Sequence, residues 1–260
     1  MRKHIIVLIT IATSFGFMAF SLNSNRGIEP IAVSNHQSID SEGLIANVNF
    51  LYDFGPRFEV TIKKGDLDKV KSATYFYTEE EIESIVSFKS AAIIVIENEA
   101  PSATRAYGTD PVLNTTQIEL LNSFGHSTNF QIGGEFVRKN KDTGQLEDGF
   151  SRPHVTVVPE KQVEYVDGKE ALIQYLINGS KDQISKLDQN KLQPGKVHFI
   201  VTENGVISDV KFSLTCGYRN VDELMIKLII NAPGNWSLAK DLNGNPVPQE
   251  LVFSFGDMSC

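Results

Sequence analysis

The sequence is poor in the residues that build redox, metal and catalytic centres. Its 260 residues include two cysteines, one tryptophan and five histidines. Because Cys216 and Cys260 lie far apart in the sequence, they form no Cys-x-x-Cys pair of the kind found in zinc sites and thiol oxidoreductases. The histidines are dispersed and belong to no His-Glu-x-x-His motif. We therefore expect no metal site and no cofactor. The five histidines are His4, His36, His126, His154 and His198.

The signatures of common hydrolases and nucleotide-binding enzymes are also missing from the sequence. There is no Gly-x-Ser-x-Gly elbow and no glycine-rich phosphate loop. Ser123 and Ser127 lie close to His126, but no acidic residue nearby would orient its imidazole, so we interpret all three as polar loop residues. The acidic residues from Glu79 to Glu83 are typical of a solvated helix face. We expect no catalytic residues; a ligand-binding or hydrolytic pocket in residues 44–159 is the alternative.

An excess of basic residues is lacking as well. The chain has 24 lysines and arginines against 32 aspartates and glutamates, which gives a formal net charge of −8. A nucleic-acid partner would need a basic face, so the net charge argues against this class of partner, and we expect none. The hydrophobic share of 41% is ordinary for a soluble globular protein, and the length allows one large domain or two small ones.

The N-terminus carries an export or anchoring signal. Arg2, Lys3 and His4 precede an uncharged apolar stretch, Ile5–Leu22, which is the pattern of a secretory signal peptide or of an uncleaved membrane anchor. Its length lies at the lower end of what spans a bilayer, about 17–25 residues. We expect a periplasmic protein that is either secreted through this signal (residues 1–22) or held in the inner membrane by residues 5–22. Residues 23–43 are polar and predict a linker.

Residues 44–159 predict an N-terminal α+β region of unknown role. Alternating apolar residues predict strands around Phe50 and around Val60, and the apolar run Ala91–Ile96 predicts a strand buried on both faces. Residues 97–111 predict a loop. Two pairs of capping residues predict short helices, and two β-rich segments predict a hairpin across residues 139–149. The pairs are Thr78 with Glu81 and Thr116 with Glu119, and the segments are Phe130–Val137 and His154–Val158.

The segment Gln193–Gly256 predicts the order strand, strand, helix, strand. Asn204-Gly205 joins the first two strands and is a strong hairpin signal. Asn220 with Glu223 predicts the start of a helix. Apolar residues recur with strand or helix spacing throughout: Val197, Phe199 and Val201; Val206, Val210 and Phe212; Val221, Leu224, Met225, Leu228 and Ile229; Leu251, Phe253 and Phe255.

This segment, with the helix before it, resembles the C-terminal domain of TonB-type proteins over roughly residues 159–256. The resemblance is carried by Gly195-Lys196-Val197, the Asn-Gly turn, Ile207-Ser208-Asp209-Val210, Pro233, Trp236, Ala239-Lys240 and Asn243-Gly244-Asn245-Pro246-Val247. Gly168-Lys169-Glu170-Ala171-Leu172 matches the helix that opens many bacterial members. The chain departs from the family at Val166-Asp167, where Pro-Gly is usual, and at Ser237-Leu238, where Lys-Pro is common.

The resemblance implies an α+β fold with two small two-layer units. The C-terminal unit, residues 160–260, would be a three-stranded antiparallel sheet with helices on one face, of the TonB and TolA C-terminal type. In TonB-like proteins the last strand forms a free edge that captures a short segment of an outer-membrane transporter, in the manner of an added strand. By position, the partner-binding residues here are Gln249, Leu251, Val252, Phe253 and Phe255. The alternative is that the N-terminal unit or a second copy of the chain covers this edge.

The resemblance also bears on the two cysteines. The family topology places Cys216 and Cys260 at the same end of the sheet, so a disulfide between them is one expectation for an exported chain. The other is that Cys216 is buried and Cys260 is a free thiol. Spacing in the sequence does not decide between them.

Two features of energy-transducing TonB proteins are missing. The prolines before Lys161 are scattered, so no stiff proline-rich spacer is present. The apolar stretch has Ser14 followed by Met18, where the family's anchor has a Ser-x-x-x-His pair. We therefore expect an exported, non-enzymatic protein that binds an envelope protein or an extended peptide through a sheet edge. An anchored component of TonB-dependent transport is the alternative; the candidate partners are an outer-membrane transporter and, as a homodimer, a second copy.

Overall fold

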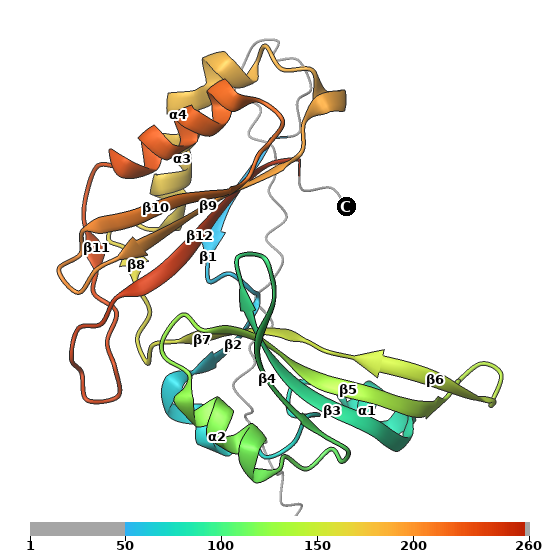
Figure 1. Ribbon diagram of the computed structural model, residues 1–260. Coiled ribbons are helices and arrows are strands. Elements are labelled where there is room, and N and C mark those ends of the chain that lie inside the picture. Colours follow the sequence, from blue (N-terminus) through green and yellow to red (C-terminus); the bar gives the residue numbers. More distant parts are fainter. Residues whose placement is uncertain (1–49, 258–260) are drawn as a thin grey trace, which may run out of the picture. The chain divides into compact units, whose positions relative to one another are not determined.

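The computed structural model describes residues 50–257, and within this range the chain has a mixed α+β fold with two main sheets and few helices (Figure 1). Each sheet has a hydrophobic core of its own. The expected α+β class is confirmed at this level. The signal or anchor (5–22), the linker (23–43) and Cys260 lie outside the described residues.

The first sheet holds most of the N-terminal region. Among the described strands, its order is β2-β7-β5-β3-β4, with β6 also paired to β5. β2 and β7 run parallel, and the remaining pairs are antiparallel. The strands are β2 (Val60–Lys63), β3 (Ile85–Glu97), β4 (Ala100–Gly108), β5 (Asn129–Lys139), β6 (Leu146–Ser151) and β7 (His154–Val158). The helices of this region are the 3-10 helix η1 (Lys64–Lys69), α1 (Glu79–Ser84) and α2 (Thr115–Ser123).

The capping residues place the two short α-helices. At α1 the expected box is confirmed: the Thr78 hydroxyl accepts from the Glu81 amide at 3.1 Å, and the Glu81 carboxylate accepts from the Thr78 amide at 2.8 Å. At α2 the expected pair was wrong, because the box is formed by Asn114 and Gln117 instead. The helix nevertheless lies where it was predicted.

The segment 97–111, expected as a loop, contains β4. A two-residue turn, Asn98-Glu99, reverses the chain between β3 and β4, and both residues have positive φ, 47° and 63°. Tight hairpins favour such turns because their twist matches that of the strands. The expectation of a buried strand at Ala91–Ile96 is confirmed, since each of these residues is buried.

The second sheet contains the predicted C-terminal strands. Its order is β1-β12-β9-β10, with α3 and α4 on one face (Figure 1). The Asn204-Gly205 hairpin and the order strand, strand, helix, strand are confirmed. The elements are β1 (Leu51–Gly55), β8 (Glu164–Tyr165), α3 (Lys169–Ile184), η2 (Gln189–Lys191), β9 (Pro194–Val201), β10 (Ile207–Leu214), α4 (Arg219–Ile230), β11 (Trp236–Ser237) and β12 (Gln249–Gly256). β8 and β11 form a separate two-stranded ribbon.

One strand of this sheet comes from the other end of the chain. β1 pairs antiparallel with β12, so the described sheet has four strands where three were expected. Residues 51–55, which we expected in the N-terminal region, therefore complete the C-terminal sheet, and the first sheet is inserted between β1 and β8. The sequence did not predict this placement, because an alternating apolar pattern predicts a strand but not the strand with which it pairs.

Within residues 50–257, no helix has the length and apolar character needed to cross a membrane.

Candidate binding site along strand β12

The residues expected to bind a partner all lie in β12, but β12 is an inner strand. Gln249, Leu251, Phe253 and Phe255 face the helices, and Val252 faces the other way; all five are buried. β9 pairs with one side of β12, and β1 pairs with the other. The expectation of a free edge at 249–255 was therefore wrong. The strand that covers residues 252–255 is β1, which belongs to the same sheet as β12 and not to the first sheet.

β1 is held on β12 by side chains at alternate positions. Three aromatic rings from the β1 segment point toward the helix side of the sheet. The Phe50 ring lies 6.2 Å from Phe255, and the Tyr52 ring 6.4 Å from Phe253. Phe54 meets Trp236 edge-on at 6.0 Å. Large aromatic side chains supply most of the contact energy at such sites.

Polar groups fix the position of β1 further. The Tyr52 hydroxyl lies 2.6 Å from the Ser180 Oγ. Because the Ser180 hydroxyl donates its hydrogen bond to the Leu176 carbonyl at 2.6 Å, the Tyr52 hydroxyl is the donor to the Ser180 Oγ. Burial raises the pKa of Tyr52 to about 12. Asp53 pairs with Lys169, whose Nζ lies 5.3 Å from the centre of the Phe54 ring. This side of β12 therefore accepts an extended chain with aromatic residues at every second position.

β1 covers only part of β12 in the described structure. Its register runs from Leu51 opposite Gly256 to Gly55 opposite Val252. The next residue is Pro56, which has no amide proton and cannot continue a ladder. Residues 249–251 are thus left without a β1 partner, and we call them the open segment of β12.

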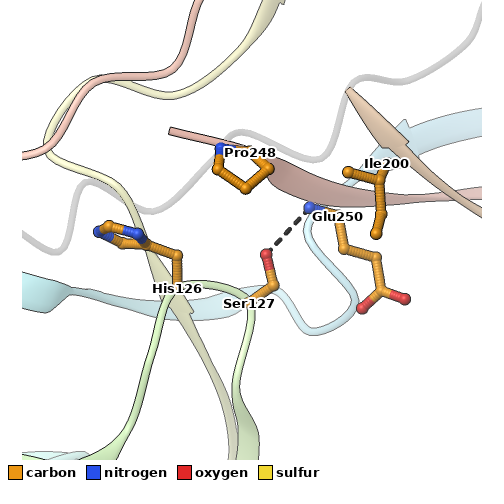
Figure 2. Close-up of a pocket in the computed structure, with 5 residues that line it drawn as sticks. All are labelled: His126, Ser127, Ile200, Pro248 and Glu250. Atoms are coloured by element: carbon orange, nitrogen blue, oxygen red, sulfur yellow. Dashed lines mark hydrogen bonds between the residues drawn. The ribbon is translucent and has the colours of Figure 1, made fainter. Parts of the chain in front are cut away.

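A recess borders the open segment (Figure 2). Its volume is about 380 Å³, and its lining residues are His126, Ser127, Ile200, Pro248 and Glu250. The Ser127 Oγ accepts a hydrogen bond from the Glu250 amide at 2.9 Å, so this amide is directed away from β9. Ser127 has a positive φ of 63°, which is uncommon for a residue other than glycine.

The side chains around this recess do not form a catalytic chain. In Figure 2 the His126 ring points away from the Ser127 hydroxyl, and the Glu250 carboxylate points away from both. Nucleophilic catalysis would need the hydroxyl, the imidazole and the acid in hydrogen-bond contact. The interpretation of Ser127 and His126 as polar loop residues agrees with this geometry.

Two other edge strands of the described sheets, β10 and β4, carry local features that interrupt part of their edges. On β10 the register slips between Ser208 and Lys211, and Asp209 has a φ of 48°, which makes a bulge. On β4 the Tyr107 carbonyl already accepts from the Asn114 side chain at 2.9 Å. Bulges and local caps are ordinary ways of protecting sheet edges.

Cys216 lies in the core of the C-terminal sheet. Burial, and secondly the neighbouring Asp222, raise the pKa of its thiol to about 12. Cys260 is outside the described residues, so a disulfide between the two stays a prediction. Among residues 50–257, no group of three or more histidine, cysteine, aspartate or glutamate side chains is placed to hold a metal ion.

Comparison with known proteins finds no family model, no curated protein and no solved structure that matches this chain.

Proposed function

We propose that this chain is an exported, non-enzymatic protein of the bacterial envelope that binds an extended segment of another envelope protein alongside β12. The observation that carries the proposal is β1 itself. It is an extended segment from a distant part of the sequence. It is docked on β12 through a backbone ladder and two aromatic contacts, and a third aromatic contact joins it to Trp236 of β11. Residues 249–255 are also the position at which the TonB-type resemblance places partner capture.

In this proposal the partner enters at the open segment and displaces β1. The Glu250 amide, directed away from β9, offers a first backbone donor once it leaves the Ser127 hydroxyl. β1 has five residues and β12 has eight, so a partner free of proline can form a longer ladder than β1 does. Each further backbone hydrogen bond contributes about 0.5–1.5 kcal/mol net, which favours the longer segment.

A short edge strand is suited to such exchange. Elements at the edge of a fold can open locally at a fraction of the free energy of global unfolding, so β1 can leave while the core of the sheet stays intact. The remaining strands β12, β9 and β10 keep Phe199 and Phe253 buried against the helices. The export part of the proposal rests on the apolar stretch 5–22, and a mature N-terminus near Leu22 would support secretion over anchoring.

A peptide experiment tests the exchange. The probe is a fluorescent peptide of residues 49–58 with the change Pro56→Thr, added to the full chain. We expect saturable binding measured by anisotropy. The matched control peptide carries serine at the positions of Tyr52 and Phe54 and should bind at least tenfold more weakly, because it lacks the two aromatic contacts.

A locked variant shows where the peptide binds. Asp53 lies directly opposite Ser254, so Asp53→Cys with Ser254→Cys, in a Cys260→Ser background, allows a disulfide that holds β1 in place. The oxidised variant should not bind the peptide, and its reduced form should bind. Equal binding by both forms, or no binding to the reduced form at saturating peptide, would contradict the proposal.

A further inference from the structure

A lysine of the helix layer contacts β1, the outermost described strand of the second sheet. The Lys169 ammonium pairs with the Asp53 carboxylate and lies 5.3 Å from the centre of the Phe54 ring. Because neighbouring residues of a strand point to opposite faces, this one side chain contacts both faces of β1. The two charged side chains are 43% and 55% exposed, so the ion pair is open to solvent and can be exchanged.

Lys169 occupies a helix position that does not favour a positive charge. It is the first residue of α3, and the unpaired N–H groups at the N-terminus of a helix carry a partial positive charge. An acidic side chain at such a position stabilises the helix, whereas a basic one does not. The helix therefore gives no reason for a lysine here, but the contacts with Asp53 and Phe54 do.

Ser180 makes a second demand on the strand beside β12. It is fully buried in α3, and its hydroxyl donates to the Leu176 carbonyl, so the Ser180 Oγ remains as an acceptor. The Tyr52 hydroxyl satisfies this acceptor at 2.6 Å. A phenylalanine in the place of Tyr52 would fill the same space but leave the buried acceptor without a donor.

The place of Phe54 makes a third demand. The Phe54 ring meets Trp236 edge-on at 6.0 Å, and the Lys169 ammonium lies over the same ring. An ammonium over an aromatic face is attracted by the negative charge of that face, and an aliphatic side chain has no such face. This place therefore favours an aromatic residue.

We propose that Lys169 and Ser180 select the partner of β12, and that the docked segment of the partner has a tyrosine, an acidic residue and an aromatic residue in succession. The inference rests on the proposed strand exchange, because a partner that replaces β1 in the same register meets the same groups. Ser180 selects the phenol, Lys169 selects the acid, and Lys169 with Trp236 selects the second aromatic ring. β1 is then an internal competitor with the same pattern as the partner.

The preference for an acidic residue is a local one. The formal net charge of the chain is −8, so the protein as a whole repels acidic segments. Attraction at the place of Asp53 therefore comes from Lys169. Because this ion pair is exposed, salt should weaken the preference, and little of it should remain in about 1 M salt, where the Debye length is about 3 Å.

The test of the acid preference uses two peptides on three proteins. The peptides are the fluorescent segment 49–58 with Pro56→Thr and the same segment with Asp53→Lys. The proteins are the full-length wild type, Lys169→Glu and Lys181→Glu. The quantity compared is the ratio of the two affinities on one protein, in which the cost of displacing β1 cancels.

The wild type should bind the aspartate peptide about three- to tenfold more tightly than the lysine peptide at low salt. Lys169→Glu should reverse this order. It should also fold, because a glutamate is favoured at the start of a helix. Lys181→Glu is the matched control: it makes the same charge change at an exposed residue near the other end of α3, and it should keep the wild-type ratio.

A second pair of peptides tests the selection of the phenol. On the wild type, the segment with Tyr52 should bind about fivefold more tightly than the segment with Tyr52→Phe, which corresponds to one net hydrogen bond. On Ser180→Ala the two peptides should bind about equally, because the acceptor of the phenol is gone.

The possible failures can be told apart. Equal peptide ratios on Lys169→Glu and Lys181→Glu would overturn the selection of an acid, and an unchanged ratio on Ser180→Ala would overturn the selection of the phenol. Either result leaves the strand exchange standing, since the peptides still bind. If no peptide bound to any of these proteins, the strand exchange itself would be wrong, and this inference with it.

Discussion

The Tyr52 hydroxyl and the Ser180 Oγ lie 2.6 Å apart although 128 residues separate them in the sequence. Tyr52 belongs to β1, and Ser180 lies in α3 on the helical face of the second sheet. The Ser180 hydroxyl donates its own hydrogen bond to the Leu176 carbonyl, so the two hydroxyls form one directed chain of hydrogen bonds. This contact joins the first described strand to the helix layer of the C-terminal sheet.

The first prediction concerns the energy of this pair. Tyr52→Phe removes one buried hydrogen bond and should lower the free energy of unfolding by about 1 kcal/mol, measured with urea. Tyr52→Ala also removes the ring from the core and should cost about 3–5 kcal/mol. Ser180→Ala completes a double-mutant cycle with Tyr52→Phe. Strict additivity of the two single changes would show that the hydroxyls do not interact in solution.

The second prediction concerns alkaline pH. Burial holds the pKa of Tyr52 at about 12, above its ordinary value of 10 in an unfolded chain. Between these values the folded state holds a proton that the unfolded state has lost, so stability is complete below about pH 10 and falls as the pH rises toward 12. The loss from this group should approach 2–3 kcal/mol, at about 1.4 kcal/mol per pKa unit.

Tyr52→Phe is the matched control for this alkaline loss, because it keeps the ring and has no titrating group. The difference in unfolding free energy between wild type and Tyr52→Phe should shrink and change sign as the pH rises from 9 to 11. A constant difference over this range would show that the phenol of Tyr52 titrates normally in the folded protein.

The sequence predicted elements well where side-chain chemistry and local geometry agree. The Thr78 box marks the start of α1, and the Asn204-Gly205 pair marks the β9–β10 hairpin. The β4 strand was missed because its turn, Asn98-Glu99, has no glycine and so gives a weak hairpin signal. Its strand residues are also mostly exposed, which removes the apolar pattern that would reveal them.

Tertiary contacts explain the missed helix cap. Asn220 and Glu223 match a capping pair, but α4 starts after Tyr218, and the Asn220 side chain bonds to Gln183 instead. The Asp222 carboxylate turns back to the Cys216 amide at 3.0 Å and closes the loop before the helix. Whether α4 begins after Tyr218 or after Asn220 depends on contacts with residues far along the chain, and a local capping motif does not contain this information.

The surroundings of the candidate site on β12 could be predicted only in part, for a similar reason. The residues of β12 could be chosen from the resemblance, but their neighbour β1 could not. The local sequence pattern of a strand does not show that it pairs with a strand from the other end of the chain, as β1 pairs with β12. The contact of Lys169 with Asp53 was also missed, because the two residues become neighbours only when β1 joins the second sheet.

The third prediction concerns the close approach of β5 to β3. A Cβ on Gly134 would lie 1.8 Å from the Ser90 carbonyl oxygen, and backbone on both sides cannot move away independently. Gly134→Ala should therefore lower the unfolding free energy by about 3 kcal/mol or more. Gly125→Ala is the matched control, since a Cβ there meets nothing within 4 Å, and it should change stability by less than about 0.5 kcal/mol. Equal effects of the two substitutions would show that β5 does not approach β3 this closely.

The fourth prediction concerns the reactivity of Cys216. Its thiol is buried, and burial raises its pKa to about 12, so at pH 8 very little of it is the thiolate that reacts with disulfide reagents. In a Cys260→Ser variant, native protein should react on the order of 100-fold more slowly than protein unfolded in urea.

The same disulfide reagent, applied to the wild type, distinguishes a disulfide between the two cysteines from two free thiols. A disulfide between Cys216 and Cys260 would leave unfolded, unreduced protein without a reactive thiol, whereas two free thiols would both react after unfolding. Mass spectrometry before and after reduction tests the same choice independently. Fast labelling of native Cys260→Ser at pH 8 would contradict the buried position of Cys216, because the thiolate can form only where solvent or a positive charge stabilises it.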